Sequence, residues 1–267
     1  MAEGAVLDFG WTDHNISPFD EIIMSLPKPY YDENGITIYH GDCLEIVAGL
    51  SDCEIDGVIT DPPFSSGTRT DAGKAMRGGM QRGAKWDDDW FSHDNMATHG
   101  FLFLIRLLGV ELLRVTKRGG SGHFFIDWRM YPNLYGALES SGWIVKNLVV
   151  WDKGHFGMGA TYRNQHELII YSEKQGSSTF NDRGVGNVIT TARSGGEFHP
   201  TEKPLELISS LIKVVTDPGM TILDPFMGSG TTLRAAKDLG RKCIGIEIEE
   251  KYCEIAVRRL AQEVLPL

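Results

Sequence analysis

The chain has 267 residues, of which 42% are hydrophobic, and this is enough for one large core and for one or two domains. No long apolar stretch occurs, and residues 2–21 lack the basic-then-apolar order of a signal peptide, so we expect neither a membrane span nor secretion. The formal net charge of −10 weighs mildly against a nucleic-acid partner, although phosphate contact requires only a local basic surface.

The cysteines and histidines point to a cytoplasmic protein without a metal. Cys43, Cys53, Cys243 and Cys253 show no Cys-x-x-Cys spacing, and the eight histidines form no ligand cluster. Free thiols in this arrangement are typical of a reducing compartment. We therefore expect neither a disulfide framework nor a zinc site.

The first part of the chain changes from irregular to regular. Residues 1–31 carry five acids against one base, together with three prolines, which predicts an irregular N-terminal arm. Residues 36–40 then alternate as a strand and residues 44–50 form a short helix. Residues 55–60 are an apolar, β-branched run, which is typical of a buried parallel strand.

The segment Asp61-Pro62-Pro63-Phe64 follows directly where that strand must end. The two prolines lack N–H groups and stiffen the turn, leaving one acid, one exposed carbonyl and one flat ring on a rigid rim. Such a rim suits a planar group that bears an NH2. Taken alone, the tetrapeptide is more typical of an ordinary proline-rich turn.

Residues 65–99 interrupt the regular order and begin with a basic run. Five bases against Asp71 alone give residues 65–85 a local charge of +4. A long run of this kind inside a domain is usually functional or disordered, so we expect a phosphate-contacting loop, with a solvated surface insertion as the alternative. The five bases are Arg69, Lys74, Arg77, Arg82 and Lys85.

The rest of the chain alternates strands with helices. We expect residues 117–120 to close a helix as a basic last turn and glycine stop, and residues 175–198 to form a long loop. The expected helices are 101–116, 133–140, 203–215, 230–239 and 250–263, and the expected strands are 122–127, 143–151, 167–171, 220–223 and 242–248. This order predicts an α/β fold, a mostly parallel, doubly wound sheet with helices on both faces, in one domain over residues 32–267 with loop insertions at 65–99 and 175–198.

A second motif, residues 224–232, lies between a short apolar strand and a helix. Gly228 and Gly230 allow tight backbone geometry and close approach of a ligand to the helix N-terminus. Thr231 stands where a P-loop needs lysine, and no third glycine completes a dinucleotide fingerprint. The motif therefore favours a ligand without phosphates, such as S-adenosylmethionine.

Two further acids follow strands of the expected sheet. Glu247 ends the strand after the glycine motif, where an acid commonly binds ribose hydroxyls. Asp42, after the first strand, is a candidate acceptor for an adenine amino group. The alternative for either acid is an exposed surface position.

With these motifs together, the chain resembles the amino-group DNA methyltransferases, over about residues 29–263. The catalytic motif precedes the cofactor motif, as in the circularly permuted β class of adenine-N6 enzymes, and the resemblance implies a Rossmann-like fold that binds S-adenosylmethionine. Residues 199–204 resemble the segment that these enzymes place at the methionine end of the cofactor, and residues 151–163 resemble the hairpin beside the target-base pocket.

The resemblance implies a full set of site residues. The catalytic residues are Asp61, Pro62, Pro63 and Phe64. The cofactor-binding residues are Asp42, Cys43, Asp61, His199, Thr201, Lys203, Pro204, Asp224, Phe226, Gly228, Ser229, Gly230, Thr231 and Glu247. DNA would contact Tyr162 and Arg163 besides the five bases of the 65–99 insertion.

The implied reaction is methylation of the N6 amino group of a flipped-out adenine in duplex DNA. Asp61 and the carbonyl of Pro62 would accept the two amine N–H bonds, and Phe64 would stack on the base. N4-cytosine methylation, methylation of RNA or of a protein glutamine, and a non-catalytic regulator remain alternatives. Phe64 stands where many relatives have tyrosine, and no separate large target-recognition region is present. Palindromic targets make a homodimer the expected assembly.

Overall fold

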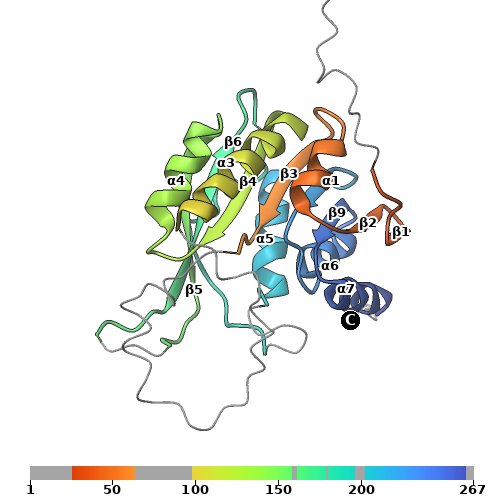
Figure 1. Cartoon of the computed structure of the whole chain (residues 1–267). Helices are drawn as coiled ribbons and strands as arrows, with labels where there is room; N and C mark the ends of the chain where they lie inside the picture. Colours follow the sequence, from red (N-terminus) through yellow and green to blue (C-terminus); the bar gives the residue numbers. More distant parts are fainter. Residues whose placement is uncertain (1–25, 64–97, 158–160, 179, 196–201, 263–267) are drawn as a thin grey trace, which may run out of the picture.

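The described part of the computed structural model, residues 26–63, 98–157, 161–178, 180–195 and 202–262, contains a nine-stranded sheet with helices on both faces (Figure 1). The strands are β1 (Tyr31–Glu33), β2 (Ile36–His40), β3 (Ile55–Thr60), β4 (Thr116–Ile126), β5 (Ile144–Asp152), β6 (His166–Glu173), β7 (Val188–Thr190), β8 (Thr221–Asp224) and β9 (Lys242–Glu247). The helices are α1 (Cys43–Gly49), α3 (Thr98–Val115), α4 (Tyr131–Ser140), α5 (Leu205–Val215), α6 (Thr231–Asp238) and α7 (Glu250–Ala261).

The strand order is β1-β2-β9-β8-β3-β4-β6-β5-β7. The central strands β2, β9, β8, β3 and β4 are parallel to one another. β1 pairs antiparallel with β2, and β6 pairs antiparallel with both β4 and β5. The predicted α/β class and mostly parallel sheet are therefore confirmed. Within the described residues, no helix has both the length and the apolar character needed to cross a membrane.

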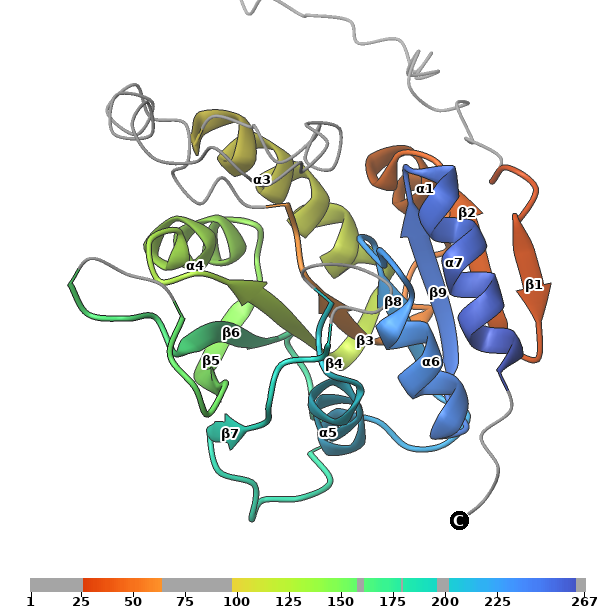
Figure 2. The ribbon, with the colours of Figure 1, turned by 90° about the horizontal axis from the view of Figure 1, so that it is seen from below.

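Two apolar cores form because successive strand residues point to opposite faces that are both covered. Val58 and Phe124 pack in the core under α1, α3 and α4, while their chain neighbours Ile59 and Phe125 pack in the core under α5, α6 and α7. Figure 2 shows α1, α3 and α4 together on one side of the sheet and α5 and α6 on the other. This double coverage explains why the central strands are almost continuously apolar in sequence.

The prediction for residues 117–120 was wrong, because they belong to β4 and not to a helix end. Helix α3 ends at Val115 and the strand begins at the next residue. The N–H of Gly119 donates to the carbonyl of Lys174 at 3.2 Å, and the N–H of Lys174 donates to the carbonyl of Gly120 at 2.9 Å. At Gly119 a Cβ would lie 2.0 Å from the carbonyl oxygen of Ser177. The glycines therefore allow a close strand contact.

Two short strands were missed. β1 pairs antiparallel with β2 through a turn at Asn34 and Gly35, whose φ angles of 53° and 79° fit the Asn-Gly hairpin signal that the sequence contains. The expected N-terminal arm therefore joins the sheet at Tyr31, and its residues 1–25 lie outside the described part. β7 lies inside the expected 175–198 loop and pairs with β5. Three-residue strands carry too little alternation to be recognised.

Candidate active site

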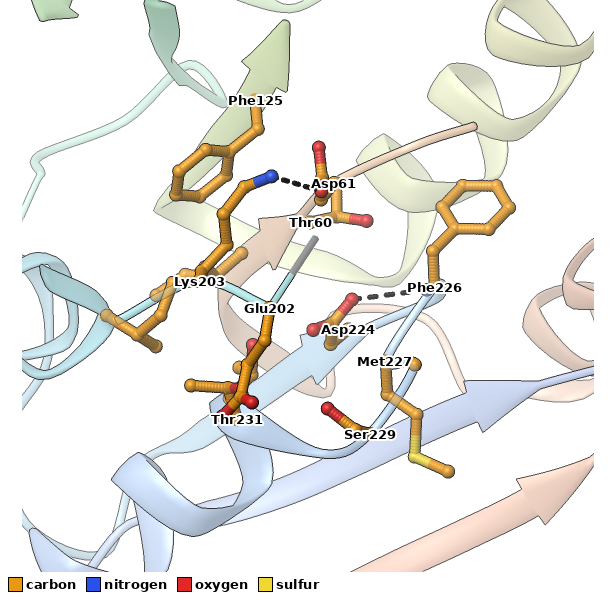
Figure 3. A pocket seen from close by; sticks show the side chains of 14 residues that line it. Thr60, Asp61, Phe125, Glu202, Lys203, Asp224, Phe226, Met227, Ser229 and Thr231 are labelled. Atoms are coloured by element: carbon orange, nitrogen blue, oxygen red, sulfur yellow. Dashed lines mark hydrogen bonds and ion pairs between the residues drawn. The ribbon is translucent and has the colours of Figure 1, made fainter. Parts of the chain in front are cut away.

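The two sequence motifs meet because their strands are parallel neighbours. β3 pairs with β8 through Gly57–Ile222 and Val58–Leu223, and Asp224 at the end of β8 lies opposite Gly245 of β9. The carboxyl ends of these strands thus place Asp61, Asp224 and Glu247 along one edge of the sheet (Figure 3 shows the first two). This edge is where ligands bind in open α/β sheets.

A cavity of about 130 Å³ lies at this edge, between Asp61 and the glycine motif. Seven of the predicted site residues line it: Asp61, Lys203, Asp224, Phe226, Gly228, Ser229 and Thr231. Thr60, Phe125, Glu202 and Met227 also contribute to its wall (Figure 3). Four chain segments that are distant in sequence therefore form a single binding site.

Only one of the two carboxylate oxygens of Asp61 has a hydrogen-bond partner among the described residues. Its Oδ2 lies 2.5 Å from the ammonium nitrogen of Lys203, whereas its Oδ1 is buried and has no hydrogen-bond partner. Burial raises the pKa of Asp61 above its usual range, although Lys203 opposes this effect. Burial by itself lowers the pKa of Lys203. The carboxylates of Asp61 and Glu167 raise this pKa by more than burial lowers it, so the lysine stays charged. The site thus contains an ion-paired carboxylate with a vacant acceptor.

The acids of the cofactor side are tied to the backbone. Glu247 accepts from the N–H of Gly228 at 3.0 Å and from the N–H of Glu249 at 2.9 Å, and burial raises its pKa. Asp224 accepts from the N–H of Phe226 at 3.1 Å, and burial raises its pKa to about 7. These bonds fix the glycine loop against β9.

The two glycines of the loop differ in what surrounds them. Gly230 has a φ of 81° and is the N-cap of α6, and a Cβ there would lie 2.7 Å from the Cβ of Ala256. Gly228 has a φ of 50°, and a Cβ there would meet nothing within 4 Å. Gly228 therefore faces open space at the cavity, while Gly230 lets α6 pack against α7.

The remaining predicted residues are placed as follows. Asp42 is exposed and caps α1, accepting from the N–H of Leu44 at 2.7 Å, and burial raises the pKa of neighbouring Cys43 to about 12. Pro204 is the N-cap of α5, one residue before the helix. None of these three lines the cavity. Phe64, His199, Thr201 and the bases Arg69, Lys74, Arg77, Arg82 and Lys85 lie outside the described residues.

The connection between β5 and β6 carries exposed aromatic rings. The side chain of Tyr162 is 98% exposed and that of Phe156 is 61% exposed. The guanidinium carbon of Arg163 lies 4.9 Å from the centroid of the Phe156 ring. Neither Tyr162 nor Arg163 lines the cavity, so these residues form a separate surface next to strands of the same sheet.

The family model described as DNA methylase, N6_N4_Mtase, matches residues 55–191 and 186–258. The chain belongs to this DNA methylase family. It is 29% identical to the type II methyltransferase M.HinfI of Haemophilus influenzae over 255 residues, which cover 86% of this chain and 69% of that protein.

Solved structures of DNA methylases share the fold. The complex of M1.HpyAVI with S-adenosylmethionine has a TM-score of 0.60 and 26% identity, covering 84% of this chain and 99% of that chain. The cytosine-N4-specific PvuII DNA methyltransferase has a TM-score of 0.69 and 17% identity, covering 89% and 90%. The predicted family and Rossmann-like methyltransferase fold are thus confirmed.

The cavity of this DNA methylase fits a cationic ligand better than a phosphate. The side chains of Asp61, Asp224 and Glu202 line it, and its one lysine, Lys203, is already bound by carboxylates. The buried Oδ1 of Asp61 has no partner, so it is available as an acceptor. S-adenosylmethionine, with a sulfonium, an ammonium and an adenine amino group, matches this donor-poor and acceptor-rich wall.

Four charged residues of the site were missed from the sequence. Glu167 of β6 lies 2.5 Å from Lys153 and 3.2 Å from Lys203, which links it to Asp61. Glu202 forms a buried ion pair with Arg259 of α7 at 2.6 Å. The available signal was a charged residue beside buried strand residues, since Glu167 directly precedes the apolar run from Leu168.

Proposed function

We propose that the protein transfers a methyl group to the N6 amino group of an adenine at a specific site in duplex DNA. The cofactor is S-adenosylmethionine, which would supply an electrophilic methyl group on a sulfonium: the N6–CH3 bond would form as the S–CH3 bond breaks, leaving the thioether S-adenosylhomocysteine, and one N6 proton would be released to solvent. The proposal is carried by one observation, the buried and partnerless Oδ1 of Asp61 on a carboxylate whose other oxygen is bound to Lys203. This oxygen belongs to an ionised carboxylate and is positioned to accept a hydrogen bond from an N–H group of a ligand.

An exocyclic adenine amine is a poor nucleophile, because its lone pair is delocalised into the ring. Asp61 Oδ1 accepts one amine N–H, and the carbonyl of Pro62 accepts the other. These two bonds localise the lone pair on nitrogen. Positioning of the reactants and electrostatic stabilisation of the transition state then accelerate the transfer. Phe64 stacks on the flipped-out base in this proposal.

The partner on the base side is DNA. Phe156, Arg163 and Tyr162 present two exposed rings and a cation on the β5–β6 connection, which suits stacking on bases and contact with phosphates. The basic run of residues 69–85 is proposed as a second phosphate contact. We also propose a cytoplasmic homodimer, which light scattering of the purified protein tests.

The first experiment is incubation with tritiated S-adenosylmethionine and unmethylated duplex DNA, followed by nucleoside digestion and chromatography. We expect label in N6-methyl-2′-deoxyadenosine and none with Asp61→Ala. Label in N4-methylcytosine would contradict the choice of base and retain the reaction. Absence of label from an enzyme that binds the cofactor would overturn the proposal in favour of RNA, protein or regulatory alternatives.

A further inference from the structure

Four side chains of alternating charge connect the catalytic acid to the β5–β6 connection. Asp61 contacts Lys203 at 2.5 Å, Lys203 contacts Glu167 at 3.2 Å, and Glu167 contacts Lys153 at 2.5 Å. Both lysine side chains are 10% exposed and that of Glu167 is 21% exposed. The four charges come from four separate chain segments and sum to zero.

An aromatic ring lies beside each lysine of this chain of charges. The ammonium nitrogen of Lys203 lies 5.2 Å from the ring centroid of Phe125, and that of Lys153 lies 4.9 Å from the ring centroid of Trp151. Figure 3 shows the Lys203 side chain between the Phe125 ring and Asp61. A buried ion pair offsets its desolvation only when its geometry is well defined, so each member depends on its neighbours for orientation.

Glu167 is the central member, because each of its oxygens faces a different lysine. Oε1 faces Lys153, whose N–H donates to the carbonyl of Gln165 at 2.9 Å at the base of the β5–β6 connection. Oε2 lies 3.2 Å from Nζ of Lys203, as an ion pair without hydrogen-bond geometry, and Lys203 directly follows Glu202 in the cavity wall. One carboxylate thus joins the segment that bears Phe156 and Tyr162 to the lysine that holds Asp61.

We infer that Glu167 is a positioning residue, which fixes Lys203 so that Asp61 keeps Oδ2 engaged and Oδ1 available, and which couples this alignment to the β5–β6 connection. The inference rests on the proposed function, in which Asp61 accepts the amine. Glu167 itself does not touch the substrate. Its loss lets the Lys203 ammonium move, and the Asp61 carboxylate then samples orientations that do not present Oδ1.

The electrostatic consequence has a defined sign. Charged groups around Asp61 come from three directions: Lys203 before α5, Glu167 and Lys153 on the β5–β6 pair, and Asp224 on β8. Besides burial, Glu167 raises the pKa of Asp61, whereas Lys203 and Lys153 lower it. Removing the charge of Glu167 alone would lower the pKa of Asp61, but the displacement of Lys203 raises it, and Lys203 affects this pKa more strongly than Glu167 does. Removing the charge of Lys153 also raises it.

The test compares Glu167→Gln with Glu173→Gln in the full-length protein. Glu173 lies on the same strand, accepts from the Tyr171 hydroxyl at 2.7 Å and pairs with Lys146, so it is a matched control remote from Asp61. Carboxyl carbon NMR titration, assigned with Asp61→Asn, follows the pKa of Asp61 without substrate. We expect a higher pKa in Glu167→Gln, because Lys203 moves away from Asp61, a higher one in Lys153→Met, and no change in Glu173→Gln.

Kinetics provide the second measurement. Glu167→Gln is expected to lower kcat on DNA on the order of 10- to 100-fold while the Kd for S-adenosylmethionine stays within about threefold. The double variant Lys153→Met/Glu167→Gln removes one charge of each sign, which keeps the cluster neutral and protects folding, and it should remain as slow as Glu167→Gln. Glu173→Gln should match the wild type.

Two results would overturn the inference: a pKa of Asp61 that is unchanged or lower in Glu167→Gln, which would mean that Lys203 keeps its place, or a raised pKa with an unchanged kcat. A loss of cofactor affinity equal to the loss of kcat would also reject positioning in favour of a general structural role. If the wild type methylates no DNA, the proposed function fails, whereas the titration still decides whether Glu167 controls Asp61.

Discussion

Glu202 and Arg259 form a buried ion pair at 2.6 Å that joins the C-terminal helix to the segment preceding Lys203. The two side chains are 5% and 8% exposed, and Arg259 also donates to the Thr231 hydroxyl at 3.0 Å. Arg259→Met leaves the Glu202 charge buried with a weakened set of partners. We expect a loss of about 3 kcal/mol in the free energy of unfolding, measured by urea denaturation.

The adjacent Arg258 supplies the control for this prediction. Its pair with Glu254 is exposed, with side-chain exposures of 76% and 52%. Arg258→Gln should change the free energy of unfolding by less than about 1 kcal/mol. Similar losses in the two variants would show that the buried pair has no special role.

Substitutions of Gly228 and Gly230 are expected to affect different properties, cofactor binding for Gly228 and stability for Gly230. Gly230→Ala places a Cβ against Ala256 of α7 in addition to its strained φ of 81°, so it should lower the free energy of unfolding by more than about 2 kcal/mol. Gly228→Ala meets no protein atom within 4 Å and carries only the φ penalty of about 1 kcal/mol, yet its methyl group enters the cavity.

Isothermal titration with S-adenosylmethionine and thermal unfolding measure the two effects of these substitutions. We expect Gly228→Ala to weaken cofactor binding about tenfold, which corresponds to about 1.4 kcal/mol. Unchanged affinity in this variant would mean that the cofactor does not approach the open side of Gly228.

Buried His123 makes stability depend on pH. Burial lowers its pKa to about 4 from an ordinary value of 6.5, so the unfolded chain binds more protons than the folded chain between these two values. The contribution of neutral His123 is complete above pH 6.5 and is lost as the pH falls toward 4. Between pH 7.5 and 5 the wild type should lose about 2 kcal/mol more than His123→Phe.

Urea denaturation at the two pH values tests the prediction for His123. The Nδ1 atom has no hydrogen-bond partner, and the ring lies 5.1 Å from that of Tyr171, so phenylalanine retains the packing. Equal pH dependence in both proteins would show that another group is responsible.

The exposed ring of Tyr162 is expected to contribute to DNA binding and not to cofactor binding. Tyr162→Ala should weaken binding to duplex DNA by about 1–3 kcal/mol, because stacking on a base is lost, and should leave the Kd for S-adenosylmethionine unchanged. Fluorescence anisotropy of labelled DNA measures the effect. Tyr30, whose side chain is 38% exposed near the β1 edge, is the control, and equal effects of Tyr30→Ala would reject a specific role.

The sequence predicts the local parts of this site well. β2 and β3 begin and end where the apolar patterns do, and the glycine motif lies between β8 and α6. Each of these features is determined by residues close together in the chain. The helix stop expected at Gly119 and Gly120 fails because tertiary pairing with Lys174 selects a strand there.

The charge network is not predictable from the sequence, because it depends on strand order and register. Lys153 meets Glu167 only because β5 pairs antiparallel with β6 so that Trp151 lies opposite Glu167, and this pairing includes a register shift near Val145. The pairing of Glu202 with Arg259 depends on how α7 packs beside α6. No local pattern contains this information.

The strand order has a consequence for the synthesis of the protein. β2 and β3 are close in the chain, yet β9 and β8 lie between them in the sheet. A ribosome that has completed β3 has therefore produced two strands that must stay apart until residues 221–247 emerge. The strand edges left open at this stage are prone to wrong pairing, and non-local pairing of this kind folds slowly. A chain terminated before β8 would lack both the glycine loop and the strand that pairs with β3 beside Asp61.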